Sequence, residues 1–152
     1  MKKTLLAAAV AALSLNAWAD VAVRESWVRG TTPAQKATGA FMEISSSDEA
    51  VLVSVSSPLA GVVEIHTTKM ENGVMKMRLV PRLDLPAGQV VKLQPGGNHV
   101  MLMDLRQQMK KGDVVPITLK VEGKDKKVQT IEIRAEVRDL AAPATVDHGH
   151  KH

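Results

Sequence analysis

The sequence of 152 residues predicts an all-β domain, an antiparallel sandwich or barrel. Short segments rich in Val, Ile, Leu and Thr recur along the chain, and turn residues interrupt them about every 8–12 residues. Strands do not alternate with helices over stretches of about 30 residues, which disfavours a parallel α/β sheet. The length suits a single domain.

The first 19 residues have the three parts of a secretory signal peptide. Lys2 and Lys3 form a positive start, Thr4–Leu15 is mostly apolar, and Ala17 and Ala19 form a small-residue cleavage site. The apolar run is about 12 residues long, whereas a membrane-spanning helix needs about 20. We therefore expect residues 1–19 to be cleaved after export to the bacterial periplasm, leaving a mature protein without a membrane span.

The expected strands follow in order through residues 20–139. They are Val21–Val28, Gly39–Ser45, Val51–Ser56, Val62–Thr68, Val74–Val80, Val90–Leu93, Asn98–Met103, Val115–Glu122 and Lys127–Val137. Turn signals such as Ser57-Pro58, Pro86-Ala87-Gly88, Pro95-Gly96-Gly97 and Lys111-Gly112-Asp113 separate them. Asn72-Gly73 predicts a two-residue hairpin. Leu105–Lys110 is expected to form a helical turn, and residues 140–152 a disordered tail.

The composition excludes several classes of function. Without cysteine the chain has no disulfide, zinc–thiolate site, iron–sulfur cluster or blue-copper centre. Removing the two signal lysines lowers the net charge from +4 to +2, and only three aromatic residues occur, so a nucleic-acid surface is not supported. Ser45–Ser47 have no neighbouring histidine, and no pair of acids is placed for acid–base catalysis. We therefore expect no enzymatic activity.

The two histidines inside the domain both occur among methionines. His99 and Met101 are two residues apart in an expected strand, so their side chains leave the same face, which Met103 continues. Val100 and Leu102 then point into the core. The Asn72-Gly73 hairpin makes the strands of His66 and Met77 neighbours and brings these two side chains to one region.

Two imidazoles and two thioethers are a ligand set for a soft, singly charged metal ion. Thioethers suit Cu(I) and are poor ligands for Mg, Ca or Zn, and four neutral ligands disfavour the divalent state. A methionine on a strand is more often core filler, and we expect that role for Met42 and Met109. Met70, Met75 and Met103 fit either the core or the surroundings of a metal.

The order His66-x₁₀-Met77-x₂₁-His99-x-Met101 resembles the signature of the PCuAC periplasmic copper chaperones. The surrounding segments 64–66, 71–78 and 93–103 are also similar to that family, and the resemblance covers Val21–Val137. It implies a cupredoxin-like Greek-key β-sandwich that holds one Cu(I) through His66, Met77, His99 and Met101.

The resemblance also implies a function and partners. Members of the family pass copper to the dinuclear centre of cytochrome c oxidase subunit II or to an assembly thiol protein. Storage or detoxification of copper, without a dedicated acceptor, is the alternative. In some relatives a histidine-rich tail looks like a second, weaker site, which predicts Cu(II) binding by His148, His150 and His152. A solvated chain end is the simpler interpretation of this tail.

Overall fold

The computed structural model describes residues 19–139, and these residues form ten strands and no helix. The expected signal peptide and the tail with His148, His150 and His152 lie outside the described residues. The strands are β1 (Val21–Arg29), β2 (Ala37–Ser46), β3 (Ala50–Ser56), β4 (Ala60–Glu71), β5 (Val74–Leu79), β6 (Leu83–Leu85), β7 (Val90–Leu93), β8 (His99–Leu105), β9 (Val114–Gly123) and β10 (Val128–Arg138).

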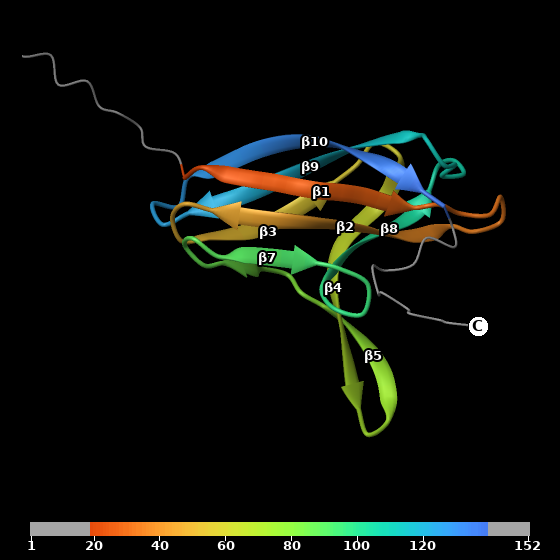
Figure 1. Ribbon diagram of the computed structural model, residues 1–152, viewed down its shortest axis with the longest axis horizontal. Coiled ribbons are helices and arrows are strands. Elements are labelled where there is room, and N and C mark those ends of the chain that lie inside the picture. The colour runs from red at the N-terminus through yellow and green to blue at the C-terminus, as the bar shows by residue number, and fades with distance from the viewer. Residues whose placement is uncertain (1–18, 140–152) are drawn as a thin grey trace, which may run out of the picture.

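All the strands belong to one continuous sheet in the order β5-β4-β8-β2-β1-β10-β9-β3-β6, with β7 paired to the second half of β2. The sheet curls around a single core, so that β3 contacts β4 and β6 contacts β2 although neither pair is adjacent in this order (Figure 1). Most neighbours are antiparallel, as predicted, but β1 and β10 run parallel, with Trp27 opposite Glu136. The predicted all-β sandwich is confirmed.

Alternation along each strand separates the core from the outer face. Ile117, Leu119 and Val121 on β9 are at most 2% exposed, while the residues between them are not buried. Val100 and Leu102 on β8 are fully buried, which confirms the face predicted for them. Met42 and Met109 are also in the core. Burial of such apolar side chains contributes about 1.5–3 kcal/mol each to folding.

Two local expectations need correction. The segment after Leu105 is not a helical turn, because the backbone N–H of Met109 donates to Thr31 Oγ1 at 2.9 Å instead of to a carbonyl of its own segment. This bond draws the Met109 side chain into the core. Leu83–Leu85 is a short strand that pairs with β3 and was not anticipated, since three residues are too few to show a periodicity.

The β4–β5 hairpin extends away from the body of the sandwich (Figure 1). Asn72 and Gly73 both have positive φ, 50° and 79°, which is the backbone of a type I′ turn and confirms the predicted hairpin. The first part of β4 pairs with β8, whereas its outer part pairs only with β5. None of the six residues of β5 is buried. The hairpin is therefore an exposed two-stranded arm attached to the sheet at His66.

Candidate metal centre

The register of the sheet brings the two histidines together at the base of the hairpin. His66 on β4 lies directly opposite His99 on β8, and their ring centroids are 6.0 Å apart. Two imidazoles that share one ion at about 2 Å from each nitrogen have ring centres about 5–6 Å apart. The two rings are therefore spaced as a pair of ligands to one ion would be.

Each histidine is held through one ring nitrogen. Nδ1–H of His99 donates to the carbonyl oxygen of Gly97 at 3.0 Å, so Nε2 of His99 carries the free lone pair. Nε2–H of His66 donates to a carboxylate oxygen of Glu64 at 2.8 Å, and its Nδ1 is buried without a hydrogen-bond partner. A buried polar atom without a partner in the protein is uncommon, and this nitrogen keeps a lone pair that a metal ion can accept. A carboxylate or carbonyl on the second nitrogen is typical of metal-binding histidines.

The two predicted thioether ligands lie on either side of the histidine pair. Met101 is on the same face of β8 as His99 and lies opposite Glu64, one cross-strand pair toward the body of the sandwich. Met77 lies opposite Thr68, one pair toward the hairpin tip, while Leu79 is the residue directly opposite His66. Met77 is thus a diagonal neighbour of His66, about 7–8 Å away between backbones and within reach of a long side chain.

Burial changes across the site. His99 is 5% exposed and the His66 side chain 16%, whereas Met77 is 57% exposed. The histidines are therefore held firmly by the sheet, and Met77 stands on the arm in contact with solvent. Met103 continues the same face beyond Met101 and is half-buried. An ion bound here would have one open side, toward the hairpin.

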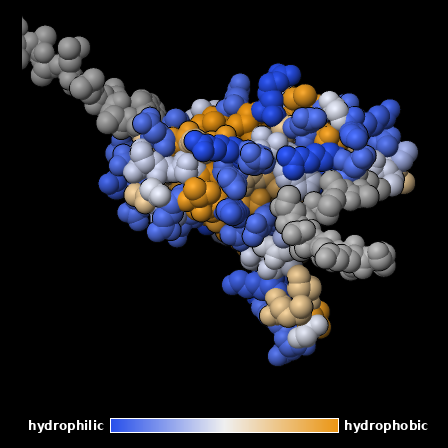
Figure 2. All heavy atoms as spheres, in the orientation of Figure 1, coloured by the Kyte–Doolittle hydropathy of each residue, from blue (hydrophilic) through white to orange (hydrophobic). Residues whose placement is uncertain are grey.

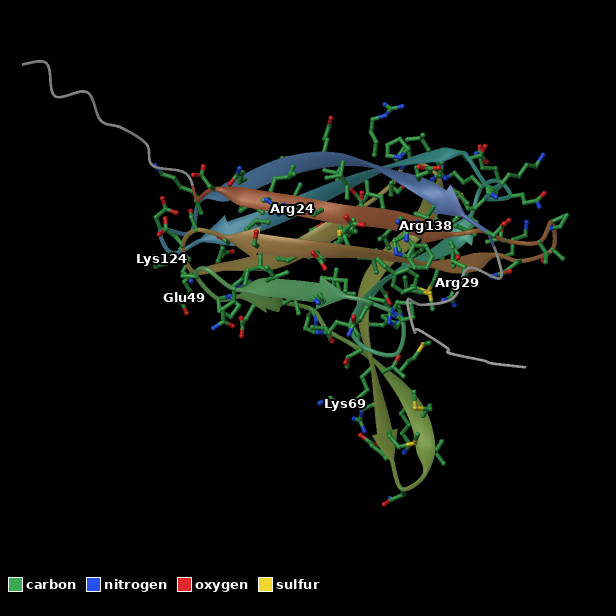
Figure 3. The ribbon with its side chains drawn as sticks, viewed as in Figure 1. Arg24, Arg29, Glu49, Lys69, Lys124 and Arg138 are labelled. Carbon is green, nitrogen blue, oxygen red and sulfur yellow. The ribbon has the colours of Figure 1, made fainter. Side chains whose placement is uncertain are left out.

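Aromatic and cationic side chains form the wall on the other side of His99. The Phe41 ring lies 6.4 Å from the His99 ring and 4.6 Å from the Trp27 ring. The guanidinium of Arg29 stands over Phe41 at 5.5 Å, and that of Arg138 over Trp27 at 5.0 Å; Figure 3 labels both arginines. This wall restricts access to His99 from β1 and β2.

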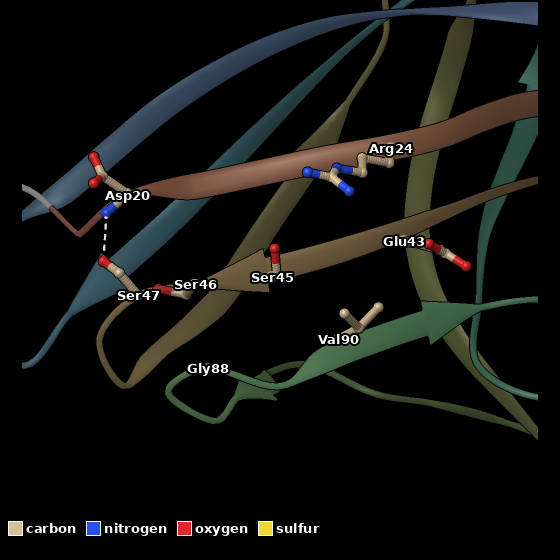
Figure 4. A pocket seen from close by; sticks show the side chains of 8 residues that line it. All are labelled: Asp20, Arg24, Glu43, Ser45, Ser46, Ser47, Gly88 and Val90. Atoms are coloured by element: carbon tan, nitrogen blue, oxygen red, sulfur yellow. Dashed lines mark hydrogen bonds between the residues drawn. The ribbon is translucent and has the colours of Figure 1, made fainter.

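The serine segment predicted to be non-catalytic lies elsewhere. Ser45, Ser46 and Ser47 line a hollow of about 420 Å³ together with Asp20 and Arg24, and the Asp20 N–H donates to Ser47 Oγ at 2.8 Å (Figure 4). Its lining contains no histidine.

Within residues 19–139, no group of three or more His, Asp or Glu side chains is placed to hold a metal ion, so a hard-ligand site is not found there. The same residues contain no helix able to cross a membrane.

Sequence reasoning predicted His66, Met77, His99 and Met101 as ligands but did not predict the hydrogen-bond partners of the histidines. Glu64 appeared in the sequence only as part of the family-like segment 64–66. Its position two residues before His66 was the available signal, because alternate residues of a strand share a face. Gly97 was assigned only to a turn, and its carbonyl is the acceptor for His99.

Comparison with known proteins identifies the family. The model of the family described as "LpqE-like" matches residues 21–137. "Putative lipoprotein Lxx21020" from Leifsonia xyli is 30% identical over 101 residues, which are 66% of this chain and 61% of that protein. The chain thus spans about three fifths of the length of this curated relative.

Solved structures show the same fold. The Cu(I) form of DR1885 from Deinococcus radiodurans is 34% identical, with a TM-score of 0.59 over 76% of each chain. The apo PCuAC domain of PmoF2 is 23% identical, with a TM-score of 0.65 over 80% of this chain and 92% of that domain, and this likeness concerns the fold alone. The protein therefore belongs to the LpqE-like family and has the cupredoxin-like β fold of PCuAC domains.

Proposed function

We propose that this protein is a periplasmic copper chaperone that binds one Cu(I) through His66, Met77, His99 and Met101 and releases it by ligand exchange. The acceptor in this proposal is the dinuclear copper centre of cytochrome c oxidase or one of its assembly factors. The observation that carries the proposal is the cross-strand pair of His66 and His99, each held through one nitrogen and flanked by a methionine on the same face.

The ligand set favours Cu(I) over other ions. All four ligands are neutral, so the bound ion keeps its single charge, and the thioethers disfavour Zn, Mg and Ca. The copper-bound form of the similar protein DR1885 is described as its Cu(I) form, which supports this assignment. Neutral thioethers also avoid the disulfide chemistry that thiols undergo in an oxidising compartment.

Exchange of ligands requires an ion that an acceptor can reach. Met77 is 57% exposed and stands on the solvent-facing arm, so an acceptor can reach the ion from the side of this thioether. An incoming thiolate or imidazole then displaces the ligands of the ion one at a time. No redox step or proton transfer at the protein is needed, which agrees with a role in transfer without catalysis.

Export is part of the same proposal. The signal-like residues 1–19 support it, and so does a relative named as a lipoprotein, because lipoproteins are exported.

The tail histidines His148, His150 and His152 are proposed as a secondary Cu(II) site, since clustered imidazoles suit Cu(II).

Anaerobic Cu(I) titration of the mature protein against a chromophoric chelator tests the binding. Wild type should bind one tight equivalent, and Met77→Ala with Met101→Ala should weaken it by about 100-fold or more without loss of the fold. Val74→Ala, an equally exposed residue on the other face of β5, is the matched control. Unchanged affinity in the double variant contradicts the assignment.

Incubation of the Cu(I)-loaded protein with the reduced copper domain of oxidase subunit II, or with an assembly dithiol protein, tests the transfer. The chaperone proposal expects the acceptor to gain the metal within minutes. Retention of copper by the chain in the presence of both acceptors favours storage instead.

A further inference from the structure

One face of the hairpin carries thioethers that the four-ligand copper site leaves unused. Met70 on β4 lies directly opposite Met75 on β5, and Met77 is one cross-strand pair closer to His66. Alternate residues of a strand share a face, so all three side chains lie on the face of the two histidines. Figure 3 shows sulfur atoms, in yellow, following the hairpin away from the body.

These methionines do not fill a core. Met70, Met75 and Met77 are 64%, 55% and 57% exposed, and among the described residues the outer part of β4 pairs with β5 alone. The sequence allowed two roles for Met70 and Met75, in the core or near a metal ion. Their exposure excludes the core. Exposed apolar groups on an edge hairpin promote aggregation. Their presence at paired positions therefore suggests a function.

The opposite face of the hairpin has a different chemistry. Lys76 and Arg78 alternate with the methionines along β5, and both contact the carboxylate of Glu71, at 3.6 and 2.8 Å. Lys69, labelled in Figure 3, points to the side away from the sulfur atoms. Apolar and hydrophilic side chains accordingly lie on different sides of the arm in Figure 2. The cations are kept away from the thioether face, which would suit a positively charged ion.

We propose that Met70, Met75 and Met77 form a second, weaker Cu(I) site at the hairpin, through which the ion enters and leaves the His66/Met77/His99/Met101 site. This inference rests on the proposed function. Three thioethers are soft neutral ligands that suit Cu(I) and little else. The site is weaker because it lacks imidazoles and is exposed to solvent.

The spacing of the cross-strand pairs supports Met77 as a ligand common to both sites. A strand rises about 3.3 Å per residue, so successive pairs on one face are about 7 Å apart. The Met70–Met75 pair is thus about 13 Å from the histidine pair, and Met77 is midway. Methionine has three rotatable bonds, so its sulfur can turn toward either end.

The transfer consists of balanced ligand exchanges. Cu(I) held by Met70, Met75 and Met77 gains the imidazole nitrogens of His66 and His99 as the bonds to Met70 and Met75 break. Met101 then completes the inner site. The ion stays singly charged throughout, the thioethers and imidazoles stay neutral, and no electron or proton moves. Because Met77 serves both sites, the chain holds one tightly bound ion at a time.

Stopped-flow exchange of Cu(I) between the mature protein and a chromophoric chelator tests the route. Met70→Leu with Met75→Leu keeps the apolar volume and removes both thioethers. The rates of Cu(I) loading and unloading should each fall by about tenfold, because the variant removes the intermediate at the hairpin. The Kd should change by less than about twofold, because the free protein and the inner site keep all their ligands. Adding Val74→Met, which places a thioether on the opposite face, should not restore the rates.

A second measurement detects the outer site directly. In a His66→Ala, Met101→Ala background, Cu(I) should shift the ¹³C-methyl signals of Met70, Met75 and Met77, and Met70→Leu with Met75→Leu should abolish this residual binding. Unchanged exchange rates or unshifted methyl signals overturn the inference. A slower exchange seen only with a protein acceptor also overturns it, because it would indicate that the methionine face docks that acceptor. A concentration-dependent dimer that Met70→Leu with Met75→Leu removes overturns it too, because the methionines would then form a contact between two copies of the chain. The proposed function is tested separately. It stands, whatever these measurements show, if wild type binds Cu(I) tightly and Met77→Ala with Met101→Ala does not.

Discussion

Glu64 offers a sharp test of how the proposed metal site is organised. Its carboxylate accepts the Nε2–H of His66 at 2.8 Å, which selects the tautomer with a free lone pair on Nδ1. Replacing Glu64 by Ala removes this acceptor, so the imidazole can rotate and change tautomer. We expect the Cu(I) affinity to fall.

The magnitude follows from the exposure of the pair. Loss of a carboxylate that orients a metal-binding histidine typically weakens metal affinity by about 10–100-fold. The Glu64 side chain is 38% exposed, so water partly replaces it and the lower end of that range applies. The expected loss for Glu64→Ala is about tenfold, or about 1.4 kcal/mol. Glu64→Gln keeps a weaker acceptor, so its Cu(I) affinity should lie between those of Glu64→Ala and wild type.

Anaerobic chelator competition at one pH and ionic strength measures this effect. Glu71→Gln removes the same charge from the same strand, but its partners are Arg78 and Lys76 and not a histidine. It should therefore leave the Kd within about twofold of wild type. An affinity of Glu64→Ala equal to or tighter than that of wild type would refute the reasoning, since it would mean that Glu64 competes with the metal for His66.

Three further outcomes are expected. A Cβ on Gly39 would lie 2.7 Å from the Phe41 ring, so Gly39→Ala should cost about 1–3 kcal/mol in denaturant unfolding and, because that ring adjoins His99, also weaken Cu(I) binding. Thr31→Val leaves the buried Met109 N–H without its acceptor and should cost about 1–3 kcal/mol of stability, while Cu(I) affinity in a chelator titration stays unchanged. Protons compete with the metal for imidazole nitrogen, so affinity should decrease as the pH is lowered from about 8 to 5; a flat profile would argue against histidine ligands.

Local pattern in the sequence was sufficient for much of the fold. Alternation of apolar and polar residues predicted nine of the strands, since the side-chain period of a strand is set by its own backbone. Asn72 and Gly73 tolerate positive φ, which determined the hairpin and hence the proximity of β4 and β5. The candidate soft ligands could be proposed from the sequence because the chemistry of imidazole and thioether groups does not depend on the fold.

The neighbours of those strands were decided only by the tertiary structure. Periodicity tells which face a residue occupies but not which strand lies beside it, because pairing between distant segments depends on how the whole sheet buries its core. This is why the opposition of His66 and His99, the parallel pairing of β1 with β10 and the exposed position of Met70 were not predictable. The residue types of the proposed site are a property of the sequence, and the opposition of His66 and His99 at the base of an exposed arm is a property of the sheet.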